Sequence, residues 1–166
     1  MYTKKVLDHF RKPQNFGKMD KPDGVGKVGN IVCGDVMWLY IKVEKNKNSN
    51  DIIKDIKFET FGCVAAIATS SAVTQIAKGK TLDKALTIEK STIINSLGAL
   101  PPIKIHCSVL AVDALNEAIY DYLDKSHMNI PVDLAKKHQK LQIEKEIVDD
   151  KYKDWINTEE KLHQHE

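Results

Sequence analysis

The residues of this chain best suited to chemistry are its three cysteines, because each lies beside a residue that could share or admit a metal ion. They belong to the motifs Cys33-Gly34-Asp35, Gly62-Cys63 and His106-Cys107. Three thiolates with a carboxylate and an imidazole combine soft and hard ligands. Stable ferredoxin clusters use four cysteines, so three cysteines completed by Asp35 or His106 predict a labile metal or iron–sulfur centre. Lability is what a protein needs if it gives its cluster away.

The spacing of the cysteines argues against an ordinary structural zinc site. Structural zinc is usually held by CxxC pairs that close tight chelate loops, whereas these cysteines are 30 and 44 residues apart. The fold must therefore bring them together. An odd cysteine count and an amino terminus without an apolar signal region predict free thiols in the reducing cytoplasm.

Composition and charge exclude several classes of partner. The chain of 166 residues is 42% hydrophobic, has a formal charge of +2 and contains a single arginine, Arg11. This balance lacks the excess of positive charge that is typical of proteins that bind nucleic acid or an anionic membrane. Residues 60–77 carry no charge, but they are rich in Ala, Thr and Ser. They predict a buried helix rather than a membrane span.

The first half of the chain predicts a short helix followed by a small sheet. The helix is expected over the first dozen residues. Residues 37–43 and 55–59 alternate apolar with polar or aromatic side chains, which is the period of a strand. The polar segment 44–51 is expected to be the hairpin loop between them. A third strand is expected over 25–32.

The second half predicts helices over 64–78, 82–86 and 89–97, and a longer one from Ile103 or Cys107 to Lys125. A helix amino terminus carries a partial positive charge, so we expect Cys63 and Cys107, at or near helix starts, to be held as thiolates. Gly34 and Gly62 remove side-chain bulk beside two of the thiols. A cluster or a partner's loop could then approach the backbone closely.

Strands followed by helices predict an α+β fold, with a small three-stranded antiparallel sheet packed on one face by several helices. Residues 1–126 are expected to form one domain. Residues 127–166 are highly charged and contain no cysteine, and they are expected to add a C-terminal helical extension. His163 and His165 are expected to be solvated terminal residues rather than ligands.

The sequence resembles the IscU/NifU-like iron–sulfur cluster assembly scaffold proteins in four segments that span nearly all of residues 1–125. The segments are VLDHFRKPQNFG at 6–17, CGDVMWLYIKV at 33–43, IKFETFGCVAAIATSSAVTQIAKGKTLDKAL at 56–86 and LGALPPIKIHCSVLAVDALNEAI at 97–119. Three cysteine motifs in the family's order make the match specific. The run LGALPPIKIHCSVLA is closer to the NifU-like branch, and the resemblance implies the NifU N-terminal domain fold.

The resemblance implies a role for each ligand. Cys33, Cys63 and Cys107 would bind the cluster, with Asp35 as the fourth ligand or the residue that keeps the site labile. His106 would be an alternative ligand, used especially when zinc occupies the site. Cys107 matches the position that accepts persulfide sulfur. The chain would then be a scaffold rather than an enzyme: iron ions enter, electrons reduce the persulfide, and a labile [2Fe-2S] cluster forms.

The resemblance also implies partners, which are an IscS/NifS-like cysteine desulfurase and apo iron–sulfur proteins. The segment Leu100, Pro101, Pro102, Ile103 and Lys104 resembles the LPPVK motif that a dedicated Hsp70 chaperone reads. The two prolines also explain this segment as a rigid turn before a helix. Whether the cluster is [2Fe-2S] or [4Fe-4S], and whether two chains share it in a homodimer, stays open.

Two departures from the family pattern concern the site. Val64 and Ala65 stand where Gly-Ser is common, which would alter backbone freedom beside Cys63. The gap between Cys33 and Cys63 is longer than usual, which fits the polar loop at 44–51.

Two other functions use the same ligands. A zinc-bound sulfur acceptor of the SufU type would hold zinc there, but that branch typically has an insertion between the second and third cysteines, for which 44 residues are too few. A structural zinc domain would have a closed and inert site. Zinc in the purified protein would be compatible with all three functions, because zinc outranks iron(II) in affinity.

Overall fold

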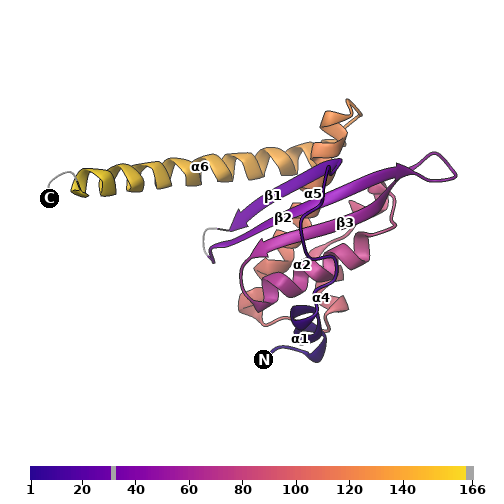
Figure 1. Cartoon of the computed structure of the whole chain (residues 1–166), viewed down its shortest axis with the longest axis horizontal. Helices are drawn as coiled ribbons and strands as arrows, with labels where there is room; N and C mark the ends of the chain where they lie inside the picture. Colours follow the sequence, from indigo (N-terminus) through magenta and orange to yellow (C-terminus); the bar gives the residue numbers. More distant parts are fainter. Residues whose placement is uncertain (31–32, 164–166) are drawn as a thin grey trace. The chain divides into compact units, whose positions relative to one another are not determined.

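The computed structural model describes residues 1–30 and 33–163, which form two compact units, Met1–Ile130 and Pro131–Glu166. The first unit contains a three-stranded sheet with helices packed against it (Figure 1). Its strands are β1 (Gly24–Asn30), β2 (Asp35–Lys45) and β3 (Asp51–Phe61), all antiparallel and in the order β1-β2-β3. The predicted α+β fold with a three-stranded antiparallel sheet is confirmed.

The hairpin between β2 and β3 is tighter than the sequence predicts. The side-chain oxygen of Asn46 accepts hydrogen bonds from the backbone N–H groups of Asn48 and Asn50, which closes the turn early. Lys45 therefore still pairs with Asp51 across the two strands. The predicted loop over 44–51 is wrong at both ends for this reason. The third predicted strand corresponds to β1, and residues 31–32, which we also assigned to it, lie outside the described residues.

The inner face of the sheet follows the predicted alternation. Met37, Leu39 and Ile41 of β2 are fully buried, as are Ile56 and Phe58 of β3. Each set occupies every second position, so these side chains point to the same face. This face forms the core against the helices.

Helix α2 (Val64–Ala77) is the buried helix that the uncharged segment predicts. Ten of its fourteen residues are buried, and four of these carry hydroxyl groups. The hydroxyls do not lie unpaired in the core: Ser71 Oγ, for example, accepts a hydrogen bond of 2.8 Å from the backbone N–H of Gln14 and lies 2.7 Å from Nδ1 of His9. These bonds hold both α1 (Lys4–Arg11) and the segment after it on α2.

Strand β1 lies unusually close to helix α5 (Ile105–Lys125). A Cβ atom built on Gly24 would collide with the carbonyl oxygen of Ala118, and one built on Gly26 with the carbonyl oxygen of Ala114. Only glycine permits this approach of strand and helix backbones. The approach places α5 across β1 and β2 and thereby fixes where its first turn lies.

The remaining helices of the first unit agree with the sequence within a residue or two at each end. They are α3 (Leu82–Ala85), α4 (Lys90–Ser96) and the 3₁₀ turn η1 (Pro102–Lys104) that leads into α5. The side chain of Thr81 caps α3 by accepting a hydrogen bond from the backbone N–H of Lys84. Gly79 and Gly98 adopt φ values of +81° and +84°, which end the helices before them.

The second unit contains one continuous helix, α6 (Val132–His163), in the region where the sequence predicts a C-terminal helical extension. Its exposed apolar residues include Ile143 and Ile147. None of the helices in the described part of the chain combines the length and apolar character that crossing a bilayer requires.

Candidate metal centre

The three cysteines come from three different connections of the fold. Cys33 lies in the turn between β1 and β2, and Cys63 is the N-cap residue of α2, directly after β3. Cys107 is in the first turn of α5. The predicted placement of the cysteines at element ends is therefore confirmed.

Asp35 enters the site through the alternation of β2. It is the first residue of that strand and lies on the same face as Met37 and Leu39, so its side chain points inward and is only 4% exposed. Burial of a carboxylate is costly unless it is paired. Here the carboxylate faces the thiols of Cys63 and Cys107, which are candidates to share a cation with it.

The atoms of this group already have the spacing of a metal site. Cys63 Sγ is 3.9 Å from Cys107 Sγ, and Asp35 Oδ2 is 3.9 Å from Cys63 Sγ and 3.8 Å from Cys107 Sγ. A Zn–S bond of about 2.3 Å gives a tetrahedral edge of about 3.8 Å between ligand atoms. The Sγ atoms of Cys63 and Cys107 therefore have the separation of two sulfur ligands of one ion, and Asp35 Oδ2 lies close enough to be a third candidate ligand.

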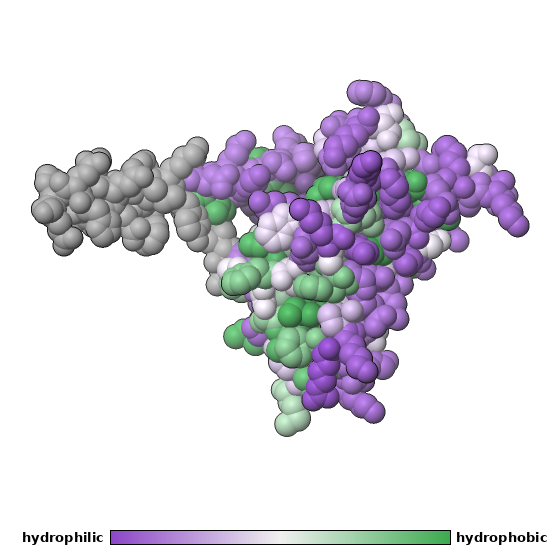
Figure 2. Space-filling model, in the orientation of Figure 1, coloured by the Kyte–Doolittle hydropathy of each residue, from purple (hydrophilic) through white to green (hydrophobic). Residues whose placement is uncertain are grey.

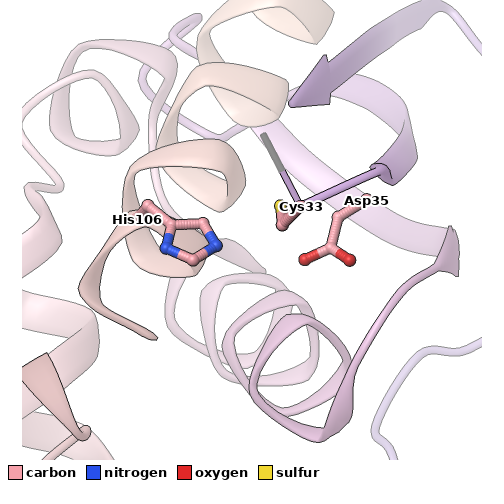
Figure 3. A group of neighbouring side chains, drawn as sticks. All are labelled: Cys33, Asp35 and His106. Atoms are coloured by element: carbon pink, nitrogen blue, oxygen red, sulfur yellow. The ribbon is translucent and has the colours of Figure 1, made fainter. Parts of the chain in front are cut away.

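A second group of donors shares Asp35. The ligand atoms of Cys33, Asp35 and His106 lie within 4.8 Å of one another, and Figure 3 shows the three side chains around one common space. His106 Nε2 is also 3.6 Å from Cys107 Sγ. All five residues that the sequence singled out as ligands are therefore brought together, in two overlapping groups of three.

Gly62 has a more specific steric role than the sequence indicated. A Cβ atom at this position would lie 2.9 Å from Cγ and 2.9 Å from Oδ1 of Asp35. The absence of a side chain makes room for the Asp35 carboxylate, which is part of the site itself. By contrast, a Cβ atom at Gly34 would meet no atom within 4 Å, but this residue has φ of +71°, which favours glycine.

The environment of Cys107 differs from the expectation of a helix-stabilised thiolate. Burial raises the pKa of the Cys107 thiol, and the negative charges of Cys63 and Asp35 raise it further. These effects outweigh the field of the α5 amino terminus, because the thiol is only 1% exposed. Burial likewise raises the pKa of Cys33. A bound cation would compensate this clustering of acidic groups.

The predicted docking segment lies directly before α5. Leu100 is buried, whereas the side chain of Ile103 is 78% exposed. The pKa of Lys104 is raised, chiefly by its interaction with the nearby Cys63. The segment therefore combines an exposed apolar residue with a cation near one of the candidate ligands.

An open cleft gives access to part of the centre. It has a volume of about 420 Å³ and is lined by Cys33, Gly34, Asp35, Thr60, Phe61, Gly62 and Cys63. Phe61 is 78% exposed at its edge, and Figure 2 shows apolar surface on the side of the molecule where β3 runs into α2. Sequence reasoning did not single out Phe61. The available signal was an aromatic residue directly before Gly62-Cys63, on the face of β3 where Lys57 and Glu59 are polar.

The sequence analysis missed one residue whose side chain contacts the site. Thr69 of α2 was not singled out, yet its hydroxyl group donates a hydrogen bond to the backbone carbonyl of Cys107. Nothing in the sequence marks that partner, since it lies in a different helix. The side chains of His163 and His165 lie outside the described part of the structure.

The chain matches the family model described as the NifU-like N terminal domain over residues 1–129. It is 53% identical over 147 residues to a protein of Archaeoglobus fulgidus named iron-sulfur cluster assembly scaffold protein IscU 1, and the match covers 89% of each chain. The matched stretch is longer than the family domain. Part of the C-terminal extension therefore has a counterpart in this relative, which the sequence comparison with the family had not suggested.

Two solved structures share the fold. One is the N-terminal part of a NifU-like protein from Brucella abortus, with a TM-score of 0.59 and 18% identity, covering 74% of this chain and 94% of that one. The other is a protein from Fervidobacterium islandicum described as a putative scaffold of the SUF system, with a TM-score of 0.57 and 22% identity, covering 71% of this chain and 96% of that one. At these identities the likeness concerns the fold alone.

Proposed function

We infer the function of this chain from one premise: it belongs to the family of NifU-like N-terminal domains. We propose that it is a scaffold on which an iron–sulfur cluster is assembled and then passed to other proteins, as the name of its Archaeoglobus relative indicates for that protein. As a scaffold it is not an enzyme. Its contribution is a set of ligands, and iron and sulfur are its cargo.

The observation that carries this proposal is the convergence of three thiols, one carboxylate and one imidazole in two groups that share Asp35. Thiolates are soft ligands that suit iron–sulfur clusters, whereas carboxylate and imidazole are harder. We propose that Cys33, Cys63 and Cys107 bind a [2Fe-2S] cluster and that Asp35 or His106 completes its ligands. The weaker binding of the harder ligand makes the cluster labile.

We propose that Cys107 is the sulfur acceptor. Its thiolate attacks the outer sulfur of a persulfide on a cysteine desulfurase, so that a new S–S bond forms on Cys107 and the thiolate of the donor cysteine leaves. Two electrons from a separate reductant then reduce this sulfur to sulfide for the cluster. Because Cys107 is 1% exposed, the transfer requires a local opening of the site.

The partners follow from this chemistry. We propose a cysteine desulfurase as sulfur donor and apo iron–sulfur proteins as recipients. The exposed Ile103 and the cation Lys104 support a docking role for residues 100–104, for which an Hsp70-type chaperone is one candidate. All three cysteines are free, which suits the reducing cytoplasm, where we propose that the protein acts.

A zinc-bound sulfur acceptor is the second candidate function. The distances of 3.8 to 3.9 Å among Asp35, Cys63 and Cys107 fit a single zinc ion as well as one iron ion. In that function zinc would stay bound while one cysteine accepts sulfur. The same fold is compatible with both functions, so a reconstitution experiment is needed to distinguish them.

The test is anaerobic reconstitution with iron(II), cysteine, a cysteine desulfurase and a reductant, followed by visible absorption. We expect the charge-transfer bands of an iron–sulfur cluster on the parent chain and their loss in Cys107→Ser. A parent chain that accepts persulfide and retains zinc, but develops no cluster bands, would support the zinc function. Equal persulfide acceptance by Cys107→Ser would refute the assignment of the acceptor.

A further inference from the structure

The thiols of Cys63 and Cys107 belong to different helices, so the packing of α2 against α5 sets the distance between them. Cys63 caps α2, and Cys107 lies in the first turn of α5. Their Sγ atoms are 3.9 Å apart, close to the edge of about 3.8 Å that a tetrahedral thiolate site requires. A small displacement of one helix along the other would therefore change the metal site directly.

Thr69 joins these two helices at this point. Its side chain is fully buried, and its Oγ1 lies 3.1 Å from the carbonyl oxygen of Cys107. The same hydroxyl lies 2.9 Å from the carbonyl oxygen of Ala65 and 3.2 Å from that of Ala66, so its one proton is shared among three acceptors. The contact with Ala65 is the usual bond of a helical threonine to the residue four positions earlier. The contact with Cys107 crosses to the other helix.

The bond reaches the backbone of a proposed ligand. Thr69 lies roughly 9 Å along α2 from Cys63, since a helix rises about 1.5 Å per residue. It therefore fixes the first turn of α5 relative to the same helix that carries Cys63 at its start. Groups that orient metal ligands in this way have measurable effects on metal affinity.

We propose that Thr69 is a positioning residue of the metal centre: its hydroxyl holds the backbone of Cys107 so that the thiol lies beside that of Cys63. This role deepens the proposed scaffold function and takes its biological meaning from it. The bond itself does not involve iron or sulfide, so its effect is measurable with a simpler metal ion.

The test compares Co(II) binding to the full chain and its variants, because Co(II)–thiolate charge-transfer bands report on sulfur ligands. Thr69→Val removes the donor and keeps nearly the same shape. We expect it to raise the Kd for Co(II) about 10- to 100-fold and to weaken these bands. Thr69→Ser keeps the hydroxyl group, so we expect this variant to have the parental Kd for Co(II) and the parental charge-transfer bands.

Thr74→Val is the matched control. Thr74 is also a buried threonine of α2, and its hydroxyl group lies 2.8 Å from the carbonyl oxygen of Ser71 and 3.4 Å from that of Gln14. It accepts a hydrogen bond of 3.1 Å from Nδ2 of Asn15 and, among the described residues, makes none to α5. We expect this variant to bind Co(II) with parental affinity. Circular dichroism and urea unfolding of the metal-free proteins report on folding separately. If Thr69→Val does not fold, Thr69→Ala takes its place under the same criteria.

A folded Thr69→Val or Thr69→Ala with the parental Kd and the parental bands would overturn the inference. The inference would also be overturned if Thr69→Ser lost as much Co(II) affinity as Thr69→Val. The parent chain could fail to assemble a cluster while the Thr69 variants still differ from it in Co(II) affinity. That result would refute the scaffold function but would leave the positioning role of Thr69 supported. The two proposals are therefore tested independently.

Discussion

At the scale of single residues, the position of Asp35 depends on Gly62. We predict that Gly62→Ala displaces the carboxylate, because the new Cβ atom would lie 2.9 Å from Cγ of Asp35. Loss of one oxygen ligand should raise the Kd for Co(II) by about tenfold or more. Titration of Co(II) into the metal-free protein measures this change.

A double-mutant comparison separates this cause from general damage. In an Asp35→Ala background the collision with the carboxylate is absent, so Gly62→Ala should have little further effect on Co(II) affinity. A full additional loss in that background would show that Gly62 acts through another contact, such as the Cβ atom of Ala66 at 2.9 Å.

The burial of Cys107 predicts how the stability of the metal-free protein depends on pH. The folded state raises the pKa of this thiol above its ordinary value of 9.0, so the folded state favours the neutral form. The corresponding contribution to stability is present below pH 9.0 and is lost as the pH rises toward the raised pKa. We expect the free energy of unfolding of the parent chain to fall more steeply than that of Cys107→Ser.

Urea unfolding in the presence of a reductant, from about pH 8 to about pH 10, measures this difference. Tyr40, whose pKa is raised to about 12 by burial and by Glu59, is common to both proteins and titrates mostly above this range. Parallel curves for the parent and Cys107→Ser would contradict the account. Metal affinity should change in the opposite sense and rise with pH, since the ligand is the thiolate.

At the scale of elements, the contact of β1 with α5 positions the first turn that carries Cys107. We predict that Gly26→Ala destabilises the protein by about 1–3 kcal/mol or more, because its Cβ atom would collide with the backbone of α5 at Ala114 and Ala118. Gly29→Ala is the matched control in the same strand, since the nearest atoms there are 3.7 and 3.8 Å away. Equal free energies of unfolding for the two variants would refute this prediction.

The same contact shows why part of the fold could not be read from the sequence. Strand β2 was predictable from the alternation that begins at Met37, and the same alternation extends back to Asp35. Strand β1 has the sequence GVGKVGN, in which two inward positions are glycines. The reason for those glycines is a helix about ninety residues later in the chain, and no local pattern contains that information.

The sequence was sufficient to predict which residues form the candidate site, but not how deeply their side chains are buried. Motif spacing and family resemblance identified Cys33, Asp35, Cys63, His106 and Cys107. Local sequence placed Cys107 at a helix start, and from that we expected a thiolate. Tertiary burial reverses the expectation, because the pKa of a thiol depends on its neighbours in space more than on its own helix. Thr69 was missed for the same reason.

At the scale of the whole molecule, all the proposed ligands belong to the unit Met1–Ile130. We therefore predict that a chain ending at Ile130 binds Co(II) with a Kd within about twofold of the full chain, as expected for independent regions. Co(II) titration and circular dichroism of the two chains measure this. A folded short chain with a much weaker site would show that residues 131–166 contribute to the metal centre.

A scaffold must release the cluster that it builds. The most direct measurement follows a reconstituted cluster after addition of an apo-ferredoxin, with the two proteins separated before their absorption spectra are recorded. We expect the cluster bands to leave this chain and appear on the ferredoxin, because Asp35 or His106 takes the place of a fourth thiolate ligand. A cluster that stays on this chain indefinitely, beside an apo-ferredoxin able to accept one from chemical reconstitution, would contradict it.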